Sequence, residues 1–458
     1  MPNEIFNDRY YSRRNQYTNQ LAGEITAKYS PQDFSRIVVP NQSIENYLAV
    51  TGNNFPSKES INVLLGNTRE LVTPGHHYTR QYEVGRDNQT QESVNELVKK
   101  TFDAVYAISY ISIAEKARSE SSSLSQSDIE ENAFAAAANF IAKIPDFIEW
   151  HRWNVFAHLK DPAIWSNAVR EGISLEDIAR LENTDFPKSV MDSLTQGNTQ
   201  PYQDLLNTIG AGNKYPLLLN LVDSRYDGPK SLLNHYIAHQ LAVPDTKSGD
   251  LKPNALYLIP ELIQEINSAL GLDAHPEAKI GYGELIDHER GTVVIGQTGI
   301  VGNYWDFAGG GIVLGGLSRK PSQRHPILGN GISIGTSTMF FGPIVIGDYS
   351  RFGVNSIIIG YIRFGNECRV GSDVDIGSYN SLNGNNSRPG QIIFENGVIV
   401  GDGSTILNTG EEDLVIGKEF KIEPKSYVVG VSGKPQLVER THNPEIRADA
   451  KRLAGDRI

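Results

Sequence analysis

The chain has 458 residues, of which 54 are acidic and 42 are lysine or arginine, giving a formal net charge of −12. The length allows two or three domains, and the negative charge argues against a dedicated surface for nucleic acid or anionic membranes. The longest strongly apolar stretch, Ala104–Ala114, is too short to span a bilayer. The N-terminus lacks a signal-peptide core, and the single cysteine, Cys368, fits a reducing compartment. We therefore expect a cytoplasmic protein.

The first 270 residues show the spacing of helices. Apolar residues recur three and four positions apart in Ser93–Arg118, Glu131–Leu159, Gly228–Leu241 and Ala255–Leu272. A serine-rich segment between the first two predicts an exposed loop. Pro145 is expected to kink or divide the second helix, and Gly271 to end the last one. The pattern predicts a helical domain over residues 1–270.

Beyond Gly271 the apolar period changes to six residues. The bulky positions are Leu328, Ile334, Phe340, Ile346, Phe352, Ile358, Phe364, Val370, Ile376 and Leu382, and glycine directly follows seven of them, from Gly329 to Gly377. Neither a helix nor an ordinary strand has this period, but the hexapeptide repeat of a parallel β-helix does. Each bulky residue is expected to point into a narrow prism, with glycine at the corners because φ can be positive there.

Shorter pieces in the same register extend the prediction to a β-helix domain over residues 271–432, followed by a tail over residues 433–458. The basic, proline-containing segment Gly315–Pro326 breaks the period and is expected to leave the prism as a loop. Cys368 falls within the repeat, where a small buried side chain is expected rather than a nucleophile.

A few ionisable residues interrupt these repeats. Taken alone, His288 or His325 reads as a surface histidine, Asp273 or Asp287 as a turn cap, and Arg324 as part of a solvated loop. Together they suggest a site, because a histidine held by a carboxylate is a good general base and an Arg with an Asp can hold both ends of a zwitterion. Lys320, next to Arg319, suits a phosphate-bearing cofactor. The histidines are too few for a zinc site, so no metal is expected.

The segments that carry these residues resemble a known family. Leu272–Val301, which includes "LDAHPEAKIG" and "DHERGTVVIGQT", is similar to the start of the left-handed β-helix of bacterial serine acetyltransferases, and "VLGGLSRKPSQRHPIL" to their R-H-P loop. "IPDFIEWHRWNVFAHLKDPA" and "YIAHQL" resemble helices of the longer members. The resemblance implies an α+β protein in which an N-terminal all-helical domain precedes a left-handed parallel β-helix.

The resemblance also implies an activity and roles for individual residues. The activity is acetyl transfer from acetyl-CoA to the hydroxyl of L-serine, giving O-acetylserine for cysteine biosynthesis. His288 would be the general base and Asp273 would orient it; Asp161 and Asp287 would hold the acceptor's ammonium, while Arg324 and His325 would engage its carboxylate. The implied acetyl-CoA contacts are Gly315, Gly316, Lys320, Gly335 and Thr336. No covalent enzyme intermediate is required.

The family further implies partners. A homotrimer with sites between neighbouring prisms is expected, with or without pairing of trimers through the helical domains. The chain ends in "LAGDRI", and enterobacterial members end in a similar segment whose last isoleucine docks into O-acetylserine sulfhydrylase. Ile458 is therefore a candidate contact with that enzyme.

Three departures leave the acceptor open. Glu289 and Arg290 stand where the family has small residues, about fifty extra residues occupy 164–214, and the β-helix continues past about residue 348. One alternative is an O-acetyltransferase with another hydroxyl acceptor, such as another amino acid, a carrier-bound hydroxyl or a sugar. The other is a catalytically silent regulator of a sulfhydrylase. A carbonic-anhydrase-like β-helix is disfavoured by the histidine count.

Overall fold

A computed structural model describes the chain over most of both halves. The described residues are 5–28, 57–72, 90–119, 124–145, 147–148, 227–242, 258–281, 285–286, 292–303, 305–318, 322–378, 390–408, 410–431 and 434–438. The chain divides into two compact units, Met1–Ile266 and Asn267–Ile458. Each unit is described by itself below.

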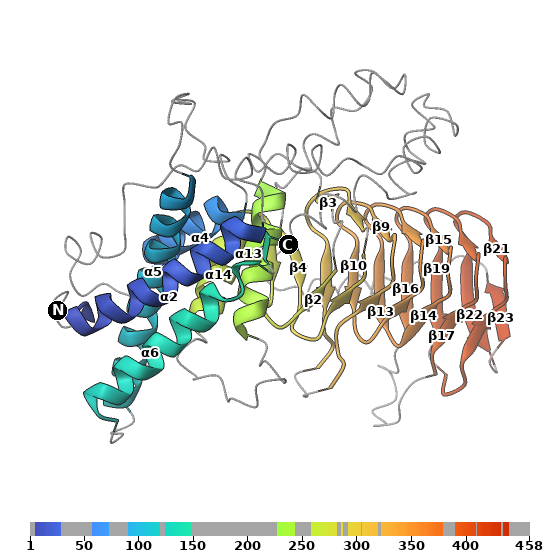
Figure 1. Ribbon diagram of the computed structural model, residues 1–458. Helices are drawn as coiled ribbons and strands as arrows, with labels where there is room; N and C mark the ends of the chain where they lie inside the picture. The colour runs from blue at the N-terminus through green and yellow to red at the C-terminus, as the bar shows by residue number, and fades with distance from the viewer. Residues whose placement is uncertain are drawn as a thin grey trace, which may run out of the picture. The chain divides into compact units, whose positions relative to one another are not determined.

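The first unit is helical, as predicted (Figure 1). Its helices are α2 (Asp8–Lys28), α4 (Lys58–Val72), α5 (Thr90–Ser119), α6 (Gln126–Ile141), α13 (Asp227–Ala242) and α14 (Leu258–Ala269). Helix α5 packs against α2, α4 and α6. Helix α6 ends before Pro145, and Gly271, with φ of 97°, follows the end of α14 as predicted. None of these described helices is long and apolar enough to cross a membrane.

A buried polar cluster joins α2 to α5. The carboxylate of Asp103, on α5, accepts hydrogen bonds from the hydroxyl of Tyr10 and from Nη1 of Arg14, the latter at 2.7 Å. The side chains of Asp103 and Arg14 are only 6% and 12% exposed. Burial, reinforced by the neighbouring Asp103 carboxylate, raises the pKa of Tyr10 well above its usual value, so its phenol stays a donor.

The second unit is a parallel β-helix with three faces. Its described strands form one nine-stranded sheet (sheet A) and two seven-stranded sheets (sheets B and C). Sheet A consists of β1 (Leu272–Ala274), β4 (Val293–Ile295), β7 (Val313–Gly315), β10 (Met339–Phe341), β13 (Ile357–Gly360), β16 (Asp375–Ser378), β19 (Thr405–Asn408), β22 (Tyr427–Val431) and β23 (Lys434–Val438). All of its pairings are parallel except that of β22 with β23.

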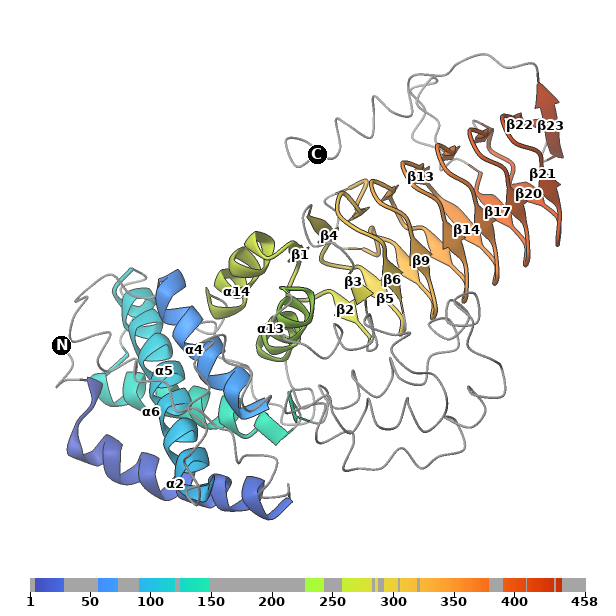
Figure 2. The same ribbon diagram turned by 90° about the horizontal axis from the view of Figure 1, so that it is seen from above.

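The other two sheets repeat the same order with shorter strands. Sheet B consists of β2 (Lys279–Ile280), β5 (Ile300–Val301), β8 (Ile327–Leu328), β11 (Val345–Ile346), β14 (Ile362–Phe364), β17 (Ile392–Phe394) and β20 (Leu414–Ile416). Sheet C consists of β3 (Leu285–Ile286), β6 (Asp306–Phe307), β9 (Ser333–Ile334), β12 (Arg351–Phe352), β15 (Arg369–Val370), β18 (Ile399–Val400) and β21 (Lys421–Ile422). Each coil therefore contributes one strand to each face, and the coils stack in a row (Figure 2). The predicted fold class is confirmed.

The six-residue series forms the core of the prism. The bulky residues from Leu328 to Ile376 are all at most 4% exposed. Phenylalanines continue the stack, with ring centroids of Phe364 and Phe394 4.6 Å apart. The next described position of this series in sheet B is Phe394, which pairs with Phe364. Leu382 itself lies outside the described residues, and the intervening polar stretch displaces the register by twelve positions.

The repeat glycines have a different role from the one predicted. None of Gly329, Gly335, Gly347, Gly353, Gly365, Gly371 and Gly377 has a positive φ. Positive φ occurs two positions later, mostly at non-glycine residues such as Ser337 and Asn355. The first six of these, Gly329 to Gly371, are needed because a Cβ would collide with the next coil; at Gly353 it would lie 2.6 Å from the carbonyl carbon of Gly371. Close stacking rather than backbone conformation therefore selects glycine.

The steric role of these glycines can be tested with a matched pair in sheet B. A Cβ on Gly365 would lie 2.6 Å from the backbone nitrogen of Asn396, whereas a Cβ on Gly417, the equivalent position after β20, meets nothing within 4 Å. We expect Gly365→Ala to lower the free energy of unfolding by about 1–3 kcal/mol through overpacking, with Gly417→Ala close to neutral. Urea unfolding of both variants measures the difference, and equal losses would contradict the steric explanation.

Small hydroxyls occupy the second inward position of several hexads. The Oγ of Ser356 donates to the carbonyl of Gly371 at 3.0 Å and accepts from the amide of Val374 at 3.1 Å. Cys368 occupies the equivalent place one coil beyond Ser350, whose Oγ accepts from the Cys368 amide at 3.2 Å. Cys368 is 1% exposed, and burial raises the pKa of its thiol, so it is a packed core residue as predicted.

Candidate functional site

The described part of the candidate site lies on the outer face of the first strands of sheet A. Asp273, in the middle of β1, pairs with Val294 of β4 and is 8% exposed. Its neighbours Leu272 and Ala274 alternate with it in direction, as strand geometry requires, and Ala274 lies opposite the core residue Ile295. Asp273 therefore points away from the core of the prism.

His325 lies over the same face, beside Gly296. Gly296 stands two residues after Val294, the residue that pairs with Asp273. Its loop, which begins after β7, leaves the prism as predicted, and no described residue between Gly316 and Pro326 belongs to a strand. A Cβ on Gly296 would lie 2.1 Å from Nε2 of His325, and one on Gly316 would lie 3.0 Å from it. Two glycines thus make room for the imidazole against the sheet.

Thr298 holds the loop in place. Its Oγ1 lies 2.9 Å from Nδ1 of His325 and accepts the amides of Arg324 at 3.1 Å and His325 at 3.3 Å. The Thr298 amide donates to Nδ1 of His325 at 3.2 Å. Because Nδ1 accepts this hydrogen bond, the proton of the neutral ring is assigned to Nε2, next to Gly296 and Gly316.

A second chain of polar contacts orients Arg324. Its Nη2 donates to Oε1 of Gln297 at 2.6 Å, and Nε2 of Gln297 donates to Glu277 at 2.7 Å. The Glu277 amide in turn donates to Nδ1 of His275 at 3.1 Å. The amide of Gln297 can satisfy a cation and a carboxylate at once, since it carries both an acceptor and a donor.

His325 stays neutral near physiological pH. Burial lowers the pKa of its imidazole to about 4, and the positive charge of Arg324, with a smaller contribution from the neighbouring His275, acts in the same direction. At pH 7 the side chain is therefore a neutral hydrogen-bond donor through Nε2 rather than a cation. Such a group can hold a ligand oxygen without repelling the guanidinium of Arg324.

The depressed pKa of His325 predicts a pH dependence of stability. The unfolded histidine gains a proton below about pH 6.5, whereas the folded one gains it only near pH 4. The unfolded state therefore binds more protons between these values, so this residue lowers stability progressively as the pH falls. The free energy of unfolding, measured with urea between pH 4.5 and 7.5, should fall less steeply with decreasing pH in His325→Asn than in the unmodified chain. The two slopes should differ by up to about 1.4 kcal/mol per pH unit. Identical slopes would contradict the assignment.

The structure brings together some of the predicted site residues. Gly316, Arg324 and His325 adjoin one another, and Asp273 lies on the same face. Gly315 ends β7 under the ring of Phe341, since a Cβ there would lie 2.6 Å from that ring. Gly335 and Thr336 precede β10 at its opposite end, so they are not brought to this cluster, and the hydroxyl of Thr336 donates to the carbonyl of Ala308 at 2.8 Å. Their predicted contacts with acetyl-CoA stay predictions.

Other predicted site residues lie outside the described residues. These are Asp161, Asp287, His288, Lys320 and the tail residue Ile458. In the sequence, Asp287 and His288 stand between β3 of sheet C and β4, the strand that pairs with β1.

Four residues of the cluster were missed by the sequence reasoning. They are His275, Glu277, Gln297 and Thr298. His275 and Glu277 stand within the "LDAHPEAKIG" stretch, and Gln297 and Thr298 within "VVIGQT", so both motifs held the signal. Their roles are only visible once the R-H-P loop is placed over β4.

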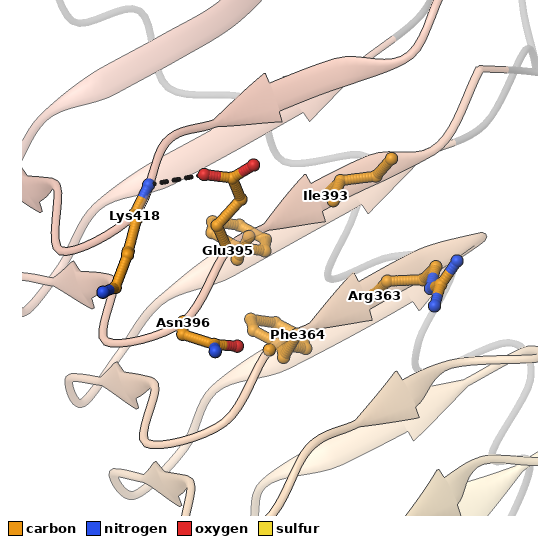
Figure 3. A pocket seen from close by; sticks show the side chains of 8 residues that line it. Arg363, Phe364, Ile393, Glu395, Asn396 and Lys418 are labelled. Atoms are coloured by element: carbon orange, nitrogen blue, oxygen red, sulfur yellow. Dashed lines mark hydrogen bonds between the residues drawn. The ribbon is translucent and has the colours of Figure 1, made fainter.

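A separate cavity opens on sheet B, far along the stack (Figure 3). It is lined by Arg363, Phe364, Gly365, Ile393, Phe394, Glu395, Asn396 and Lys418. The carboxylate of Glu395 already accepts the backbone amide of Lys418 at 2.8 Å. Within the described ranges, no group of three or more His, Cys, Asp or Glu residues is placed to bind a metal ion.

Comparisons with known proteins point in one direction. No protein-family model matches the chain. A serine acetyltransferase of Synechococcus elongatus is 33% identical over 176 residues, 38% of this chain and 60% of the relative. One of Helicobacter pylori is 34% identical over 149 residues, 32% of this chain and 78% of the relative. Serine acetyltransferase isoform 3 of Entamoeba histolytica, solved with cysteine, shares 19% identity with a TM-score of 0.44, covering 78% of this chain and 92% of that one.

The extent of these matches differs between relatives. The chain covers only 60%, 45% and 42% of the serine acetyltransferases from Synechococcus elongatus, Arabidopsis thaliana mitochondria and Haemophilus influenzae. It covers 78% and 85% of two Helicobacter pylori enzymes at 34% and 33% identity.

Proposed function

Since this chain belongs to the serine acetyltransferase family, we propose that it transfers the acetyl group of acetyl-CoA to the hydroxyl of L-serine. The product, O-acetylserine, is a precursor of cysteine. The observation that carries the proposal is the placement of Asp273, Arg324 and His325 on one outer face, beside the strand that follows His288.

The proposed chemistry is a direct attack. His288 takes the proton of the serine hydroxyl while the oxygen attacks the thioester carbon, and Asp273 orients the base. The C–S bond then breaks, and the coenzyme leaves as a thiolate that takes up a proton. Donors aimed at the developing oxyanion supply much of the rate enhancement.

The described residues suit recognition of an amino acid. The guanidinium of Arg324 presents its donors in a fixed fork, which matches the two oxygens of a carboxylate. The neutral His325 adds a donor at Nε2. Asp161 and Asp287 would hold the ammonium group, and backbone near Gly315 and Gly316, with Lys320, Gly335 and Thr336, would contact acetyl-CoA.

We further propose a homotrimer that works in the cytoplasm. A flat outer face cannot enclose a ligand by itself, so a neighbouring prism would complete the site. Docking of Ile458 into a sulfhydrylase remains a separate proposal, as does pairing of trimers.

A thiol-release assay with acetyl-CoA and a panel of hydroxyl acceptors tests the proposal. L-serine should support release, whereas homoserine and an alcohol without the ammonium group should not. Release with another acceptor alone would replace the substrate, and the extra residues 164–214 would then be the first place to look. Absence of release with every acceptor, together with binding of a sulfhydrylase, would favour the regulatory alternative.

A further inference from the structure

The outer face of sheet A carries an apolar stripe that a solvent-facing surface would not need. The stripe consists of Val313, Met339, Phe341, Ile357, Ile359 and Leu407, with Val294 and Tyr427 at its edges. Strand β16, between Ile359 and Leu407, contributes Asp375 and Gly377 to the same face, so the apolar surface narrows there. The register places these side chains on the outside, because Phe340, Ile358 and Ile406, which alternate with them, fill the core.

These outward side chains are nevertheless buried. Each of the six is between 2% and 7% exposed. Equivalent outward positions on the other two faces differ: Val415 of sheet B is 40% exposed and Ile399 of sheet C is 37% exposed. Since the prism repeats the same hexad on all three faces, the contrast indicates that sheet A has a cover that sheets B and C lack.

The path of the chain brings a candidate cover to this face. Strand β23 turns back antiparallel to β22, so that Val438 lies opposite Tyr427 at the end of the stripe. Residues 439–458 follow from that point. The stripe from β22 back to β7 extends over five strand spacings, or about 24 Å, and twenty residues reach about 30 Å even as a continuous helix.

The sequence of this segment suits an apolar surface. Asn443 and Pro444 are favourable at a helix start, as N-cap and first helical residue. The residues Ile446, Ala450, Leu453 and Ala454 then recur at spacings that place them on one helix face, while Arg447, Asp449, Lys451 and Arg452 occupy the remainder. One face is apolar and the other charged.

We propose that residues 439–458 dock along the outer face of sheet A of their own chain as an amphipathic segment. The contact buries Ile446 and Leu453 against the stripe and leaves the charged side in water. Because Phe341 covers Gly315, next to Gly316 and His325, the stripe ends beside the candidate site. The docked segment therefore lies within reach of that site, and anything that binds the segment elsewhere would uncover the sheet.

Disulfide trapping in the full chain tests the docking. Cys368 is 1% exposed and stays out of the reaction. Each test variant carries two new cysteines. One replaces Phe341, Ile357 or Leu407 on the stripe, and the other is Ile446→Cys or Leu453→Cys in the tail segment. Ile399→Cys on sheet C, with the same tail partners, is the matched control. Mild oxidation should give an intrachain disulfide in at least one stripe pair, independent of protein concentration, and none with position 399.

Three results would overturn the proposal. The first is that no stripe pair forms a disulfide. The second is that Ile399→Cys is trapped as readily as the stripe positions. The third is that the disulfides join two chains, which would show that a second copy of the chain covers the stripe. A second measurement guards against misfolded cysteine variants. The pair Ile446→Asp and Leu453→Asp should raise the fluorescence of an apolar dye several-fold, whereas Arg447→Ala and Lys451→Ala should not. Equal fluorescence in both would also count against docking. Neither readout depends on acetyltransferase activity.

Discussion

Replacing His288 with alanine is expected to lower the rate of serine-dependent thiol release from acetyl-CoA by about 10²–10⁴-fold, the usual contribution of a general base. The reason is that the serine hydroxyl is a poor nucleophile until a neighbouring group takes its proton. The loss should appear mainly in kcat, because the proposed serine contacts through Arg324 and His325 remain. Steady-state rates at several serine concentrations measure both constants.

The neighbouring Glu289 provides the matched control. Glu289→Ala alters the same segment between β3 and β4 without removing the imidazole, so it should keep most of the activity. Urea unfolding should give similar stabilities for both variants. If His288→Ala retained more than about a tenth of the rate, or if Glu289→Ala lost as much, His288 would not be the base.

Replacing Asp103 with alanine is expected to destabilise the helical unit by about 3–5 kcal/mol. The substitution leaves the Arg14 guanidinium and the Tyr10 hydroxyl buried without the carboxylate that accepts from both. A buried charge that loses its partner costs far more than the pair contributed while intact. Thermal or urea unfolding followed by far-UV circular dichroism measures the loss.

A combined replacement distinguishes the buried charge from the loss of packing. Changing Arg14 to Met and Tyr10 to Phe in the Asp103→Leu background removes all three polar groups at similar volume, and should recover most of the stability. The exposed ion pairs of Glu131 with Arg9 and Arg13 offer a surface comparison. Glu131→Ala should cost less than about 1 kcal/mol. A small effect of Asp103→Ala would show that water reaches this cluster.

The β-helix could be predicted from sequence because its signal is strictly periodic. Every inward position from Leu328 to Ile376 follows from counting by six, and each is buried. Counting by six leads from Ile376 to Leu382, whereas the described sheet B partner of Phe364 is Phe394, beyond a polar stretch of the sequence. A period identifies a repeat, but it cannot by itself show where an insertion resets the register.

The site was harder to predict, because its geometry arises between coils. Asp273 and His325 are 52 positions apart in the sequence and share one outer face only because β1 pairs with β4 and the R-H-P loop folds over Gly296. The role of Thr298 depends on the same fold, since it contacts a loop about 26 residues away. The repeat glycines were explained by the wrong property. We predicted them from glycine's tolerance of positive φ, whereas the structure shows that the neighbouring coil leaves no room for a Cβ.

The antiparallel strand β23 also limits assembly. A stack of parallel coils ends in open strand edges that another copy could extend, so the last coil is a potential template for fibre growth. On sheet A the edge of β22 is occupied by a strand of opposite direction. On the last coil of the other faces, Lys418 pairs with Glu419 and Lys421 with Glu423, all well exposed. Reversed direction and edge charges together disfavour end-to-end polymerisation.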